Sequence, residues 1–398
     1  MPTTIPPGAD VLQRMDAAKL SRFHWKIMFI SGMGFFTDAY DLFIIGVVMA
    51  LLKQEWGISP TEEGLVASTA LLASAVGAVL FGRIADMLGR KRIYGYEVLV
   101  LAVGAVASAF SPNIWWLIVF RIILGVGTGG DYPVSSTIMS EYASKRTRGM
   151  MVTLVFTMQA AGLIFGPLLA AALLWTRLSH DVIWRILLAF GAIPAMSVFW
   201  LRRHMAETPR YLLATGQRDA FGEAATHVLG QMDGGERRKG RVSDAAPGYL
   251  IAAATIDRIG RKSIQMVGFV MMAVTFGAMA FIPDVEKLLL PFLIIYGVSY
   301  FFTEFGPNST TFVYPAEIFP VRARTTGHGI AAATGKLGGF FGVFLFPILM
   351  AWKGMTAAEA AAATVSVLGA IVTLTMLPET KGLSLEELSP EAAANAQP

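Results

Sequence analysis

The sequence predicts an all-α polytopic membrane protein. Of its 398 residues, 55% are hydrophobic and only 15% are charged, whereas a typical soluble domain carries roughly 25% charged residues. The mean hydropathy is +0.57, and a water-soluble fold could not cover so much apolar surface. The chain contains no cysteine, which excludes disulfide scaffolds, thiol catalysis and zinc–thiolate sites.

Ten apolar stretches are long enough to cross a bilayer, since a helical span needs about 20 predominantly apolar residues. Six of them precede a long polar stretch, at residues 26–52, 64–82, 93–110, 114–140, 150–175 and 182–201. Four follow it, at residues 264–282, 288–314, 328–351 and 358–377. The polar N-terminal tail lacks a short apolar region ending in small residues. We therefore expect no cleavable signal peptide, and the first stretch should act as its own membrane signal.

Lys and Arg residues predict the orientation of the spans. The connections on one side carry Arg14, Lys19, Arg22, Lys26, Arg83, Arg90, Lys91, Arg92, Lys145, Arg146, Arg148 and a long basic segment from Arg202 to Arg241. The connections on the other side carry only Lys53, Arg177, Arg185, Lys287 and Lys353. Because basic residues collect on the cytoplasmic side, we expect a multi-pass protein of the plasma membrane or bacterial inner membrane with both termini cytoplasmic. The net charge of +4 and the pI near 9.2 then need no nucleic-acid partner, and the lipid bilayer is the expected partner.

The long polar stretch divides the spans into two groups. We expect a cytoplasmic tail at residues 1–25, an N-terminal six-helix bundle at 26–202, a cytoplasmic linker at 203–246, a truncated C-terminal bundle at 247–378 and a cytoplasmic tail at 379–398.

A short repeat occurs once in each predicted bundle. GRIADMLGRK at residues 82–91 is followed by AATIDRIGRK at 253–262, with Asp, Gly, Arg and Lys at the same spacing. Glycine permits a tight turn, and an Asp at a helix end can pair with a nearby Arg. Two ordinary basic loops would explain the charges but not the repeated order, so we expect these loops to hold the cytoplasmic face shut. The candidate gate residues are Asp86, Arg90, Asp257 and Arg261.

The repeated loop resembles the signature of the major facilitator superfamily. Other motifs resemble that superfamily or, more specifically, its phosphate:proton symporter family. They are PRYL at 209–212, PETKG at 378–382, GMGFFTDAYDLF at 32–43, GGDYPVSSTIMSEY at 129–142 and FGPNSTTFVYPAEIFPVRARTTGHGIAAATGK at 305–336. The resemblance implies a major facilitator fold of two pseudo-symmetric helical bundles, here with about 10 full transmembrane helices plus a short remnant. It also implies proton-coupled secondary active transport of inorganic phosphate by alternating access, carried out by a monomer that is no enzyme and needs no cofactor or metal.

Ionisable side chains inside the predicted spans are candidates for function, because a charge in hydrocarbon is costly. Asp38 and Asp41 share one face of the first span, and Asp131 lies in the fourth. These three suit proton coupling, since a carboxyl group in a low-dielectric cavity can load and release a proton near neutral pH. The candidates for charge pairs or gating are Glu97, Arg121 and Glu304. The alternative for each acid is a buried pair that only locks helices together, and the candidate partners of Arg121 are Glu97 and Asp38.

A phosphate-sized oxyanion needs several hydrogen-bond donors around it but few full positive charges, so that it can also leave. Tyr132, Gln159, Asn308 and Lys336 offer a hydroxyl, two amides and an ammonium on four different spans. Lys336 lies deep in its span and needs an anion, which the substrate or Glu304 could supply. The resemblance to phosphate symporters implies a substrate-binding role for all four donors. The alternative for Gln159 and Asn308 is hydrogen bonding between helices.

One segment that the resemblance implies is missing. Between residues 202 and 256 the only apolar run is 245–256, which can form about 18 Å of helix in a hydrocarbon core of roughly 30 Å. The seventh helix and half of the eighth are therefore absent, and we expect both ends of the remnant to stay cytoplasmic. One hypothesis is a proton-coupled phosphate importer. The other is a truncated, non-transporting relative, such as a phosphate sensor or an inactive paralogue, and a symporter for another small anion is a further alternative.

Overall fold

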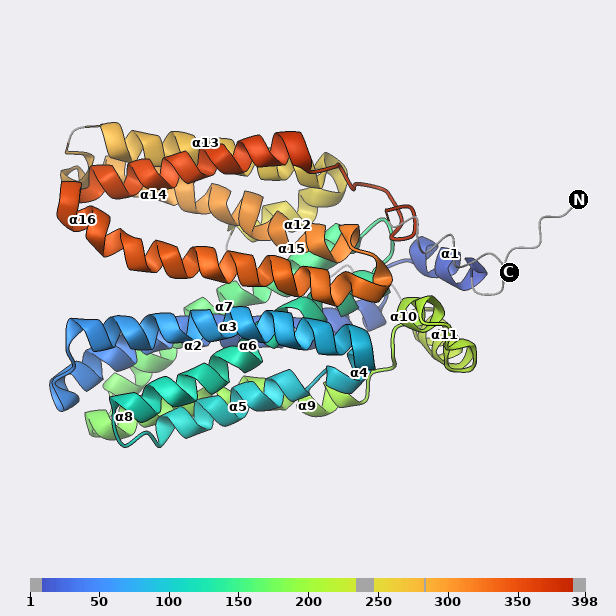
Figure 1. The fold of residues 1–398 in the computed structure, drawn as a ribbon, viewed down its shortest axis with the longest axis horizontal. Coiled ribbons are helices and arrows are strands. Elements are labelled where there is room, and N and C mark those ends of the chain that lie inside the picture. The colour runs from blue at the N-terminus through green and yellow to red at the C-terminus, as the bar shows by residue number, and fades with distance from the viewer. Residues whose placement is uncertain (1–8, 234–246, 283, 389–398) are drawn as a thin grey trace, which may run out of the picture.

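The computed structural model describes residues 9–233, 247–282 and 284–388. Within these residues ten helices are long and apolar enough to cross a membrane, which confirms the predicted number of spans. They form two bundles that lie side by side, with their helices running along the long axis of the molecule (Figure 1). The predicted all-α fold with two helical bundles is therefore confirmed.

The N-terminal bundle contains six spans. Its elements are α2 (Arg22–Trp56), α3 (Pro60–Leu88), α4 (Arg90–Ile93), α5 (Tyr96–Ala109), α6 (Ile114–Tyr142), α7 (Arg148–Leu174), α8 (His180–Phe190) and α9 (Ala192–Arg203). Helices α4 and α5 together make one span, as do α8 and α9. Glycines allow the helices to touch closely: a Cβ added at Gly129 of α6 would overlap the backbone of Ser74, and one at Gly162 of α7 would overlap the backbone oxygen of Phe36.

The C-terminal bundle contains four spans and a short remnant. Its elements are α12 (Pro247–Ile259), α13 (Arg261–Phe281), η1 (Val285–Lys287), α14 (Leu289–Thr303), η2 (Glu304–Asn308), α15 (Ser309–Ile318), η3 (Val321–Ala323) and α16 (Arg324–Met376). The span formed by α14, η2 and α15 is broken at Gly306, whose φ and ψ are −92° and −106°. Gly354, at φ +65°, bends α16 into two spans.

Helix α12 is the predicted remnant. It has 13 residues, or about 20 Å of helix, which is too short to cross the hydrocarbon core. It packs against α7 of the other bundle and against α13 and η2 of its own. The remnant therefore helps to join the two bundles at one end of the molecule.

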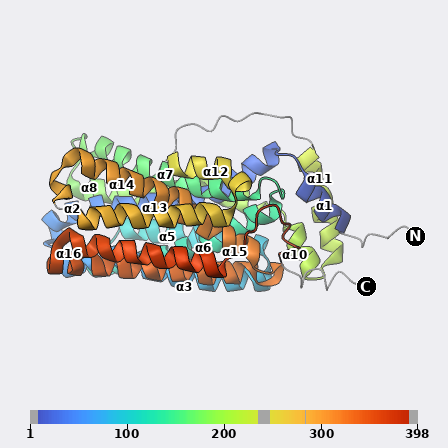
Figure 2. The same ribbon diagram turned by 90° about the horizontal axis from the view of Figure 1, so that it is seen from above.

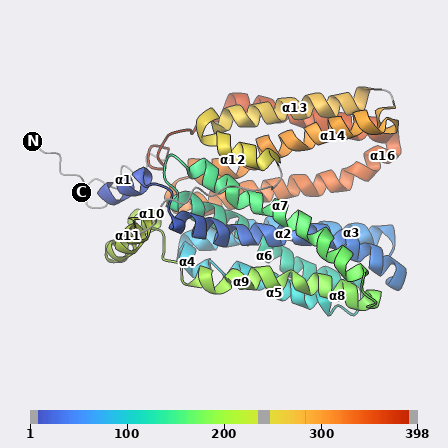
Figure 3. The ribbon, with the colours of Figure 1, turned by 180° about the vertical axis from the view of Figure 1, so that it is seen from behind.

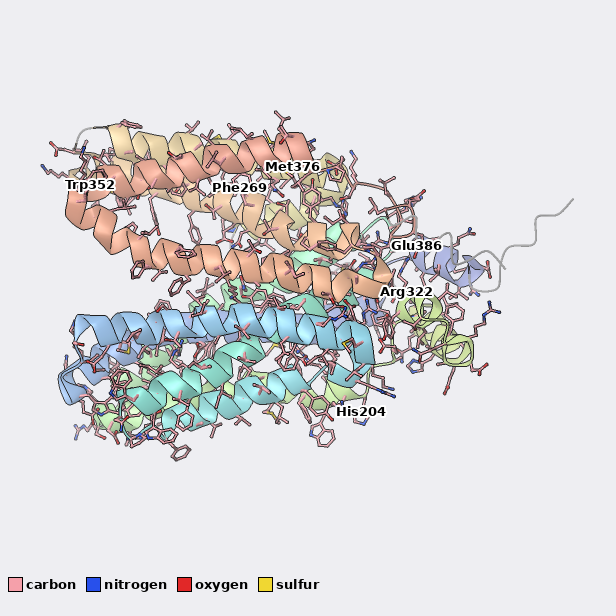
Figure 4. All side chains as sticks on the ribbon, in the orientation of Figure 1. His204, Phe269, Arg322, Trp352, Met376 and Glu386 are labelled. Carbon is pink, nitrogen blue, oxygen red and sulfur yellow. The ribbon has the colours of Figure 1, made fainter. Side chains whose placement is uncertain are left out.

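Three short helices lie beyond that same end, which we call the linker end. They are α1 (Ala9–Ala17), α10 (Pro209–Ala214) and α11 (Arg218–Asp233), and Figures 2 and 3 show them outside the bundles. Glu386 and Arg322 lie toward this end, whereas Trp352 lies at the opposite, far end (Figure 4). The rest of the predicted linker, residues 234–246, falls outside the described residues.

Candidate functional site

A central polar cluster joins the two bundles. It consists of Asp38 on α2, Tyr132 on α6, Gln159 on α7 and Lys336 on α16. The Lys336 ammonium donates to the Tyr132 hydroxyl at 3.1 Å and lies 3.4 Å from a carboxylate oxygen of Asp38. The Tyr132 hydroxyl donates to Asp38 and accepts from the Gln159 amide at 3.0 Å. The structure thus brings together three of the four candidate substrate residues and one candidate proton-coupling acid.

Aromatic rings close the central cluster on its linker side. Phe35 and Phe156 lie one helical turn closer to the linker end than Asp38 and Gln159 on the same helices. The Phe35 ring centroid lies 4.8 Å from that of Tyr132 and 4.3 Å from that of Phe156. Phe312 of α15 adds a ring whose centroid is 5.5 Å from that of Tyr132. These three rings therefore pack against one another and against Tyr132 on the linker side of the central cluster.

Asn308, the fourth candidate substrate residue, lies in a separate cluster within the C-terminal bundle. Its amide donates to Glu304 at 2.8 Å and to the Tyr249 hydroxyl at 2.5 Å. The expectation that Glu304 could neutralise Lys336 is wrong in this conformation, because Glu304 bonds to Asn308 while Lys336 faces Asp38. Tyr249 lies on the remnant α12, and sequence reasoning missed it because the length of an apolar run does not tell which of its side chains meets the next helix.

Asp131 and Glu97 share one buried guanidinium. Arg202 of α9 donates to Glu97 at 3.1 Å, to Asp131, and to the backbone oxygen of Ile30 at 3.1 Å. Its guanidinium also lies over the Tyr94 ring, 4.5 Å from the centroid. We placed Arg202 in the basic cytoplasmic connection, and this is wrong: it is fully buried inside the N-terminal bundle. The two acids buried beside it were the signal for such a partner.

Arg121 forms a second buried pair nearer the far end. Its two terminal nitrogens donate to the two oxygens of Asp41 at 3.3 and 3.1 Å, and its Nε donates to the backbone oxygen of Val66 at 3.2 Å. Glu97 and Asp38 were the expected partners, and both are wrong because each is engaged elsewhere. This bidentate geometry is strong and directional, so the position of Asp41 fits the alternative of a pair that locks helices together.

The repeated loops close the linker end in a symmetric way. Asp86, at the end of α3, accepts hydrogen bonds from the backbone N–H groups of Thr325 and Thr326, at 3.3 and 2.6 Å. Asp257 of α12 accepts from the backbone N–H groups of Gly149 and Met150, at 3.1 and 2.8 Å. Each Asp therefore caps a helix that starts in the other bundle, α16 or α7, where a carboxylate is stabilised by unpaired N–H groups and the helix dipole.

Each arginine of the repeat is held by the Asp of its own loop, as the sequence predicted, and by a Glu that sequence reasoning did not assign. Arg90 lies 3.2 Å from both Asp86 and Glu141. In the matching place, Arg261 lies 2.9 Å from Asp257 and 2.7 Å from Glu317. Glu141 lies within the GGDYPVSSTIMSEY motif at 129–142, but the motif alone does not show which side chain Glu141 contacts. All four candidate gate residues thus lie in two equivalent ion-pair networks at the linker end.

Nearly the whole chain matches the model of a known protein family. The model of a family described as "Sugar (and other) transporter" matches residues 27–246 and 246–392. The chain belongs to this family, within the major facilitator superfamily. It is 33% identical to the probable inorganic phosphate transporter 1-3 of Arabidopsis thaliana, over 96% of this chain and 98% of the relative. It is also 33% identical to the inorganic phosphate transporter 1-11 of Oryza sativa subsp. japonica, over 96% and 90%.

Solved structures of the superfamily share this fold. The proton:xylose symporter XylE bound to 6-bromo-6-deoxy-D-glucose superposes with a TM-score of 0.81 at 19% identity, covering 93% of this chain and 99% of that chain. The inward open conformation of XylE from E. coli superposes with a TM-score of 0.65 at 20% identity, covering 92% and 99%. Together with the family match and the phosphate-transporter relatives, this confirms the resemblance seen in the motifs, and the chain is a multi-pass secondary transporter rather than an enzyme.

The comparisons also locate the missing segment. The alignment with the Arabidopsis relative extends over 513 positions, more than the 398 residues of this chain, so the relative contains residues without a counterpart here. The two matched segments of the family model meet at residue 246, directly before α12. This position agrees with the loss of a helix between the two bundles.

Proposed function

We propose that this superfamily member transports inorganic phosphate together with protons, across the plasma membrane or a bacterial inner membrane. The relatives named as inorganic phosphate transporters support phosphate as the substrate, because the chain aligns with nearly their whole length. We place both termini and the linker end in the cytoplasm, since the basic connections collect at that end. The monomer is the proposed transporting unit.

The observation that carries the proposal is the position of the Lys336 ammonium between Asp38 and Tyr132. With Asp38 ionised, the ammonium has a counter-charge and needs no other anion. Protonation of Asp38 removes that counter-charge, so an oxyanion becomes the best partner for Lys336. The binding of a proton and of phosphate are then mutually favourable, as linkage requires. Tyr132 and Gln159 supply further hydrogen bonds to the phosphate.

Release to the cytoplasm requires the linker end to open. The N-termini of α16 and α7 must move away from Asp86 and Asp257. The rings on the linker side of the central cluster must also separate, namely those of Phe35, Phe156 and Phe312. Rocking of the two bundles about a midplane site would do both in one movement. In this scheme Asp131, paired with Arg202, is a second site that can bind a proton. Asn308 binds the phosphate only after α15 moves.

A second candidate function is a phosphate sensor or inactive paralogue that does not transport. The remnant α12, with its 13 residues, favours this alternative, because the C-terminal bundle has four full spans and this remnant in place of six spans. A symporter for a different small anion is a further alternative, which competition by other oxyanions would reveal.

Uptake of radiolabelled phosphate into proteoliposomes under an imposed pH gradient tests the proposal. We expect uptake above that of empty vesicles. In Asp38→Asn, which resembles the protonated acid, we expect gradient-driven uptake to disappear while exchange of phosphate across the membrane persists. In Lys336→Gln we expect both to fall at least about tenfold, the effect of losing one hydrogen bond to a charged group.

The exposed Asp284 is a matched control for Asp38, since its ion pair with Lys287 lies at the surface. Asp284→Asn should leave uptake unchanged. Gradient-driven uptake by Asp38→Asn would contradict the coupling scheme. If the wild-type chain folds and binds phosphate in equilibrium dialysis but shows no uptake, the sensor alternative replaces the transporter.

A further inference from the structure

Several buried polar groups on the cytoplasmic side of the central cluster have no hydrogen-bond partner among the described residues. Those on α4, on α6 and in the first two turns of α16 are Arg90 Nε and Nη1, the hydroxyls of Ser136, Thr137, Thr325 and Thr326, Arg324 Nη2, and both ring nitrogens of His328. Buried polar groups are normally hydrogen-bonded. Donors without a partner between two elements that move apart are available to a ligand once these elements separate.

His328 stands out in this set. Its side chain is fully buried, and neither ring nitrogen has a partner among the described residues. The ring packs against Phe312, with centroids 6.0 Å apart, and Phe312 also contacts Tyr132 of the central cluster. His328 therefore lies directly behind the aromatic rings that close the central cluster. A packing role alone would be filled better by an apolar side chain, which leaves no nitrogen unpaired.

Helix α16 carries three nitrogen donors in a row toward the cytoplasm. Lys336 faces the central cluster, His328 lies two helical turns closer to the linker end, and Arg324 lies one turn further on, where it donates to Glu141 at 3.2 Å. With a rise of 1.5 Å per residue, the steps along the helix are about 12 and 6 Å. An anion moving along this helix would meet a donor at each step.

Helix α6 presents hydroxyls to the same part of the interface. Tyr132 contacts Lys336, and Ser140 donates to the backbone oxygen of Ala316 at 2.9 Å, so the face of α6 that carries both residues is turned to the C-terminal bundle. Ser136 lies midway between them on that face. Helices α6 and α16 run in opposite directions, with Tyr132 paired to Lys336 and Glu141 to Arg324, so Ser136 and His328 both lie on the stretch between these two contacts.

We propose that His328, together with Ser136, forms a second anion site that phosphate occupies on its way to the cytoplasm. This inference rests on the proposed function and adds a release site to it. Neutral imidazole has one N–H donor and one acceptor nitrogen, which matches dihydrogen phosphate, an anion with both acceptor oxygens and P–OH donors. The site forms when the interface opens, and it binds phosphate without trapping it because it carries no full charge of its own.

Thiol labelling tests the site without relying on transport. The natural chain has no cysteine, so Ser136→Cys provides a single reporter in a protein that keeps His328. We expect a membrane-impermeant thiol reagent to label it from the cytoplasmic side. Phosphate at about nine times its dissociation constant should slow labelling about tenfold by occupying the site, whereas chloride at equal ionic strength should not.

Matched variants separate occupancy from a change in conformation. We expect the protection of Ser136→Cys by phosphate to disappear when His328→Phe is added and to return in part with His328→Asn, which keeps a donor. Ala316→Cys lies on the opposite wall, buried beside Ser140. Any protection there should be the same with His328 and with His328→Phe, because it reports only how often the interface opens.

The outcomes distinguish this site from the proposed function. If the wild-type chain does not transport, but phosphate protects Ser136→Cys in a manner that depends on His328, the release site stands and the transporter proposal fails. If the chain transports and His328→Phe leaves both protection and turnover unchanged, the release site is overturned. Absence of labelling from the cytoplasmic side also overturns it.

Discussion

The two bundles differ most where α7 and α16 run away from the linker end. These two helices are equivalent, since the N-terminus of each is capped by the Asp of the repeated loop in the other bundle. On α7, Gly162 meets the backbone of Phe36 in α2. On α16, a Cβ added at Gly338, Gly339 or Gly342 would meet no atom of the described residues within 4 Å, apart from the backbone of its own helix. Burial shows the same contrast: 44% of the most apolar 18-residue stretch of α7 is buried, but only 11% of the corresponding stretch in the first span of α16.

This difference shows what the missing helix did. The helix that covers α7 is the first span of its bundle, so the matching cover of α16 is the first span of the C-terminal bundle, which this chain lacks. The gate networks at the linker end are complete, because they use the ends of α3, α7, α12 and α16. The central cluster takes three of its four residues from the N-terminal bundle. The C-terminal bundle therefore lacks packing, while the hydrogen bonds of the central cluster and of the two linker-end networks form without the missing helix.

The largest effect should come from restoring the missing segment. The segment to insert between residues 246 and 247 is the one from the Arabidopsis relative that contains the seventh helix and the first half of the eighth. We expect this insertion to raise the melting temperature in detergent by about 10 °C or more. The inserted helix would pack on the glycine face of α16, where small residues permit close contact. Proteoliposome uptake should rise in parallel. An equally long polar insert is the control, and an equal gain from it would contradict this account.

A matched pair of glycine substitutions should have opposite effects. Gly162→Ala places a Cβ against the Phe36 backbone, and we expect it to lower the melting temperature by about 5 °C or more, as overpacking does. Gly339→Ala enters open space within a helix and should raise the melting temperature slightly, because alanine is favoured over glycine by about 1 kcal/mol. Thermal unfolding in detergent measures both. A similar loss in both variants would show that the two faces are equally covered.

The sequence predicted the spans well because hydropathy and charge are local properties of the chain. It also placed Asp86, Asp257, Asp38 and Lys336 among the candidate residues. It could not predict partners, because the rotation and crossing of helices determine which side chains meet. Arg202 shows this limit: it follows the last apolar residues of a span, and only the fold turns it inward to Asp131 and Glu97.

The two gate networks offer a finer comparison, because their geometry is equivalent although their bundles differ. Asp86→Asn and Asp257→Asn each remove one negative charge from a helix N-terminus of the other bundle. A charge in this position contributes up to about 2 kcal/mol, so each variant should increase cytoplasmic labelling of Ser136→Cys roughly tenfold. Asp181→Asn, at the far end, is the control. An effect from Asp86→Asn alone would show that the remnant α12 no longer takes part in gating.

The smallest expected effect concerns two acids, one in the segment after each bundle. Burial alone would raise the pKa of Glu386, but the charge and hydrogen bond of Arg210 hold it below its usual range. Burial raises the pKa of Glu207 in spite of hydrogen bonds from the Thr208 and Lys91 backbone. Ionised Glu386 therefore stabilises the fold above its ordinary pKa of about 4.3, and this contribution is lost as the pH falls through its lower folded value. For Glu207 the protonated form stabilises the fold: this contribution is present below its ordinary pKa and is lost as the pH rises through its raised folded value.

Melting curves at several pH values test this contrast between the two segments. We expect Glu386→Gln to lower the melting temperature by about 2 °C at pH 7, a modest effect because the side chain is partly exposed, and to approach the wild type as the pH falls through the lowered folded pKa of Glu386. Glu207→Gln should be neutral or slightly stabilising at pH 7, since it removes a buried charge. Equal losses from both variants at pH 7 would mean that the segment around Glu386 contacts the N-terminal half through packing and not through the charge of Glu386. A loss confined to Glu386→Gln would show that the ion pair between Glu386 and Arg210 stabilises the contact between the segments that follow the C-terminal and N-terminal bundles.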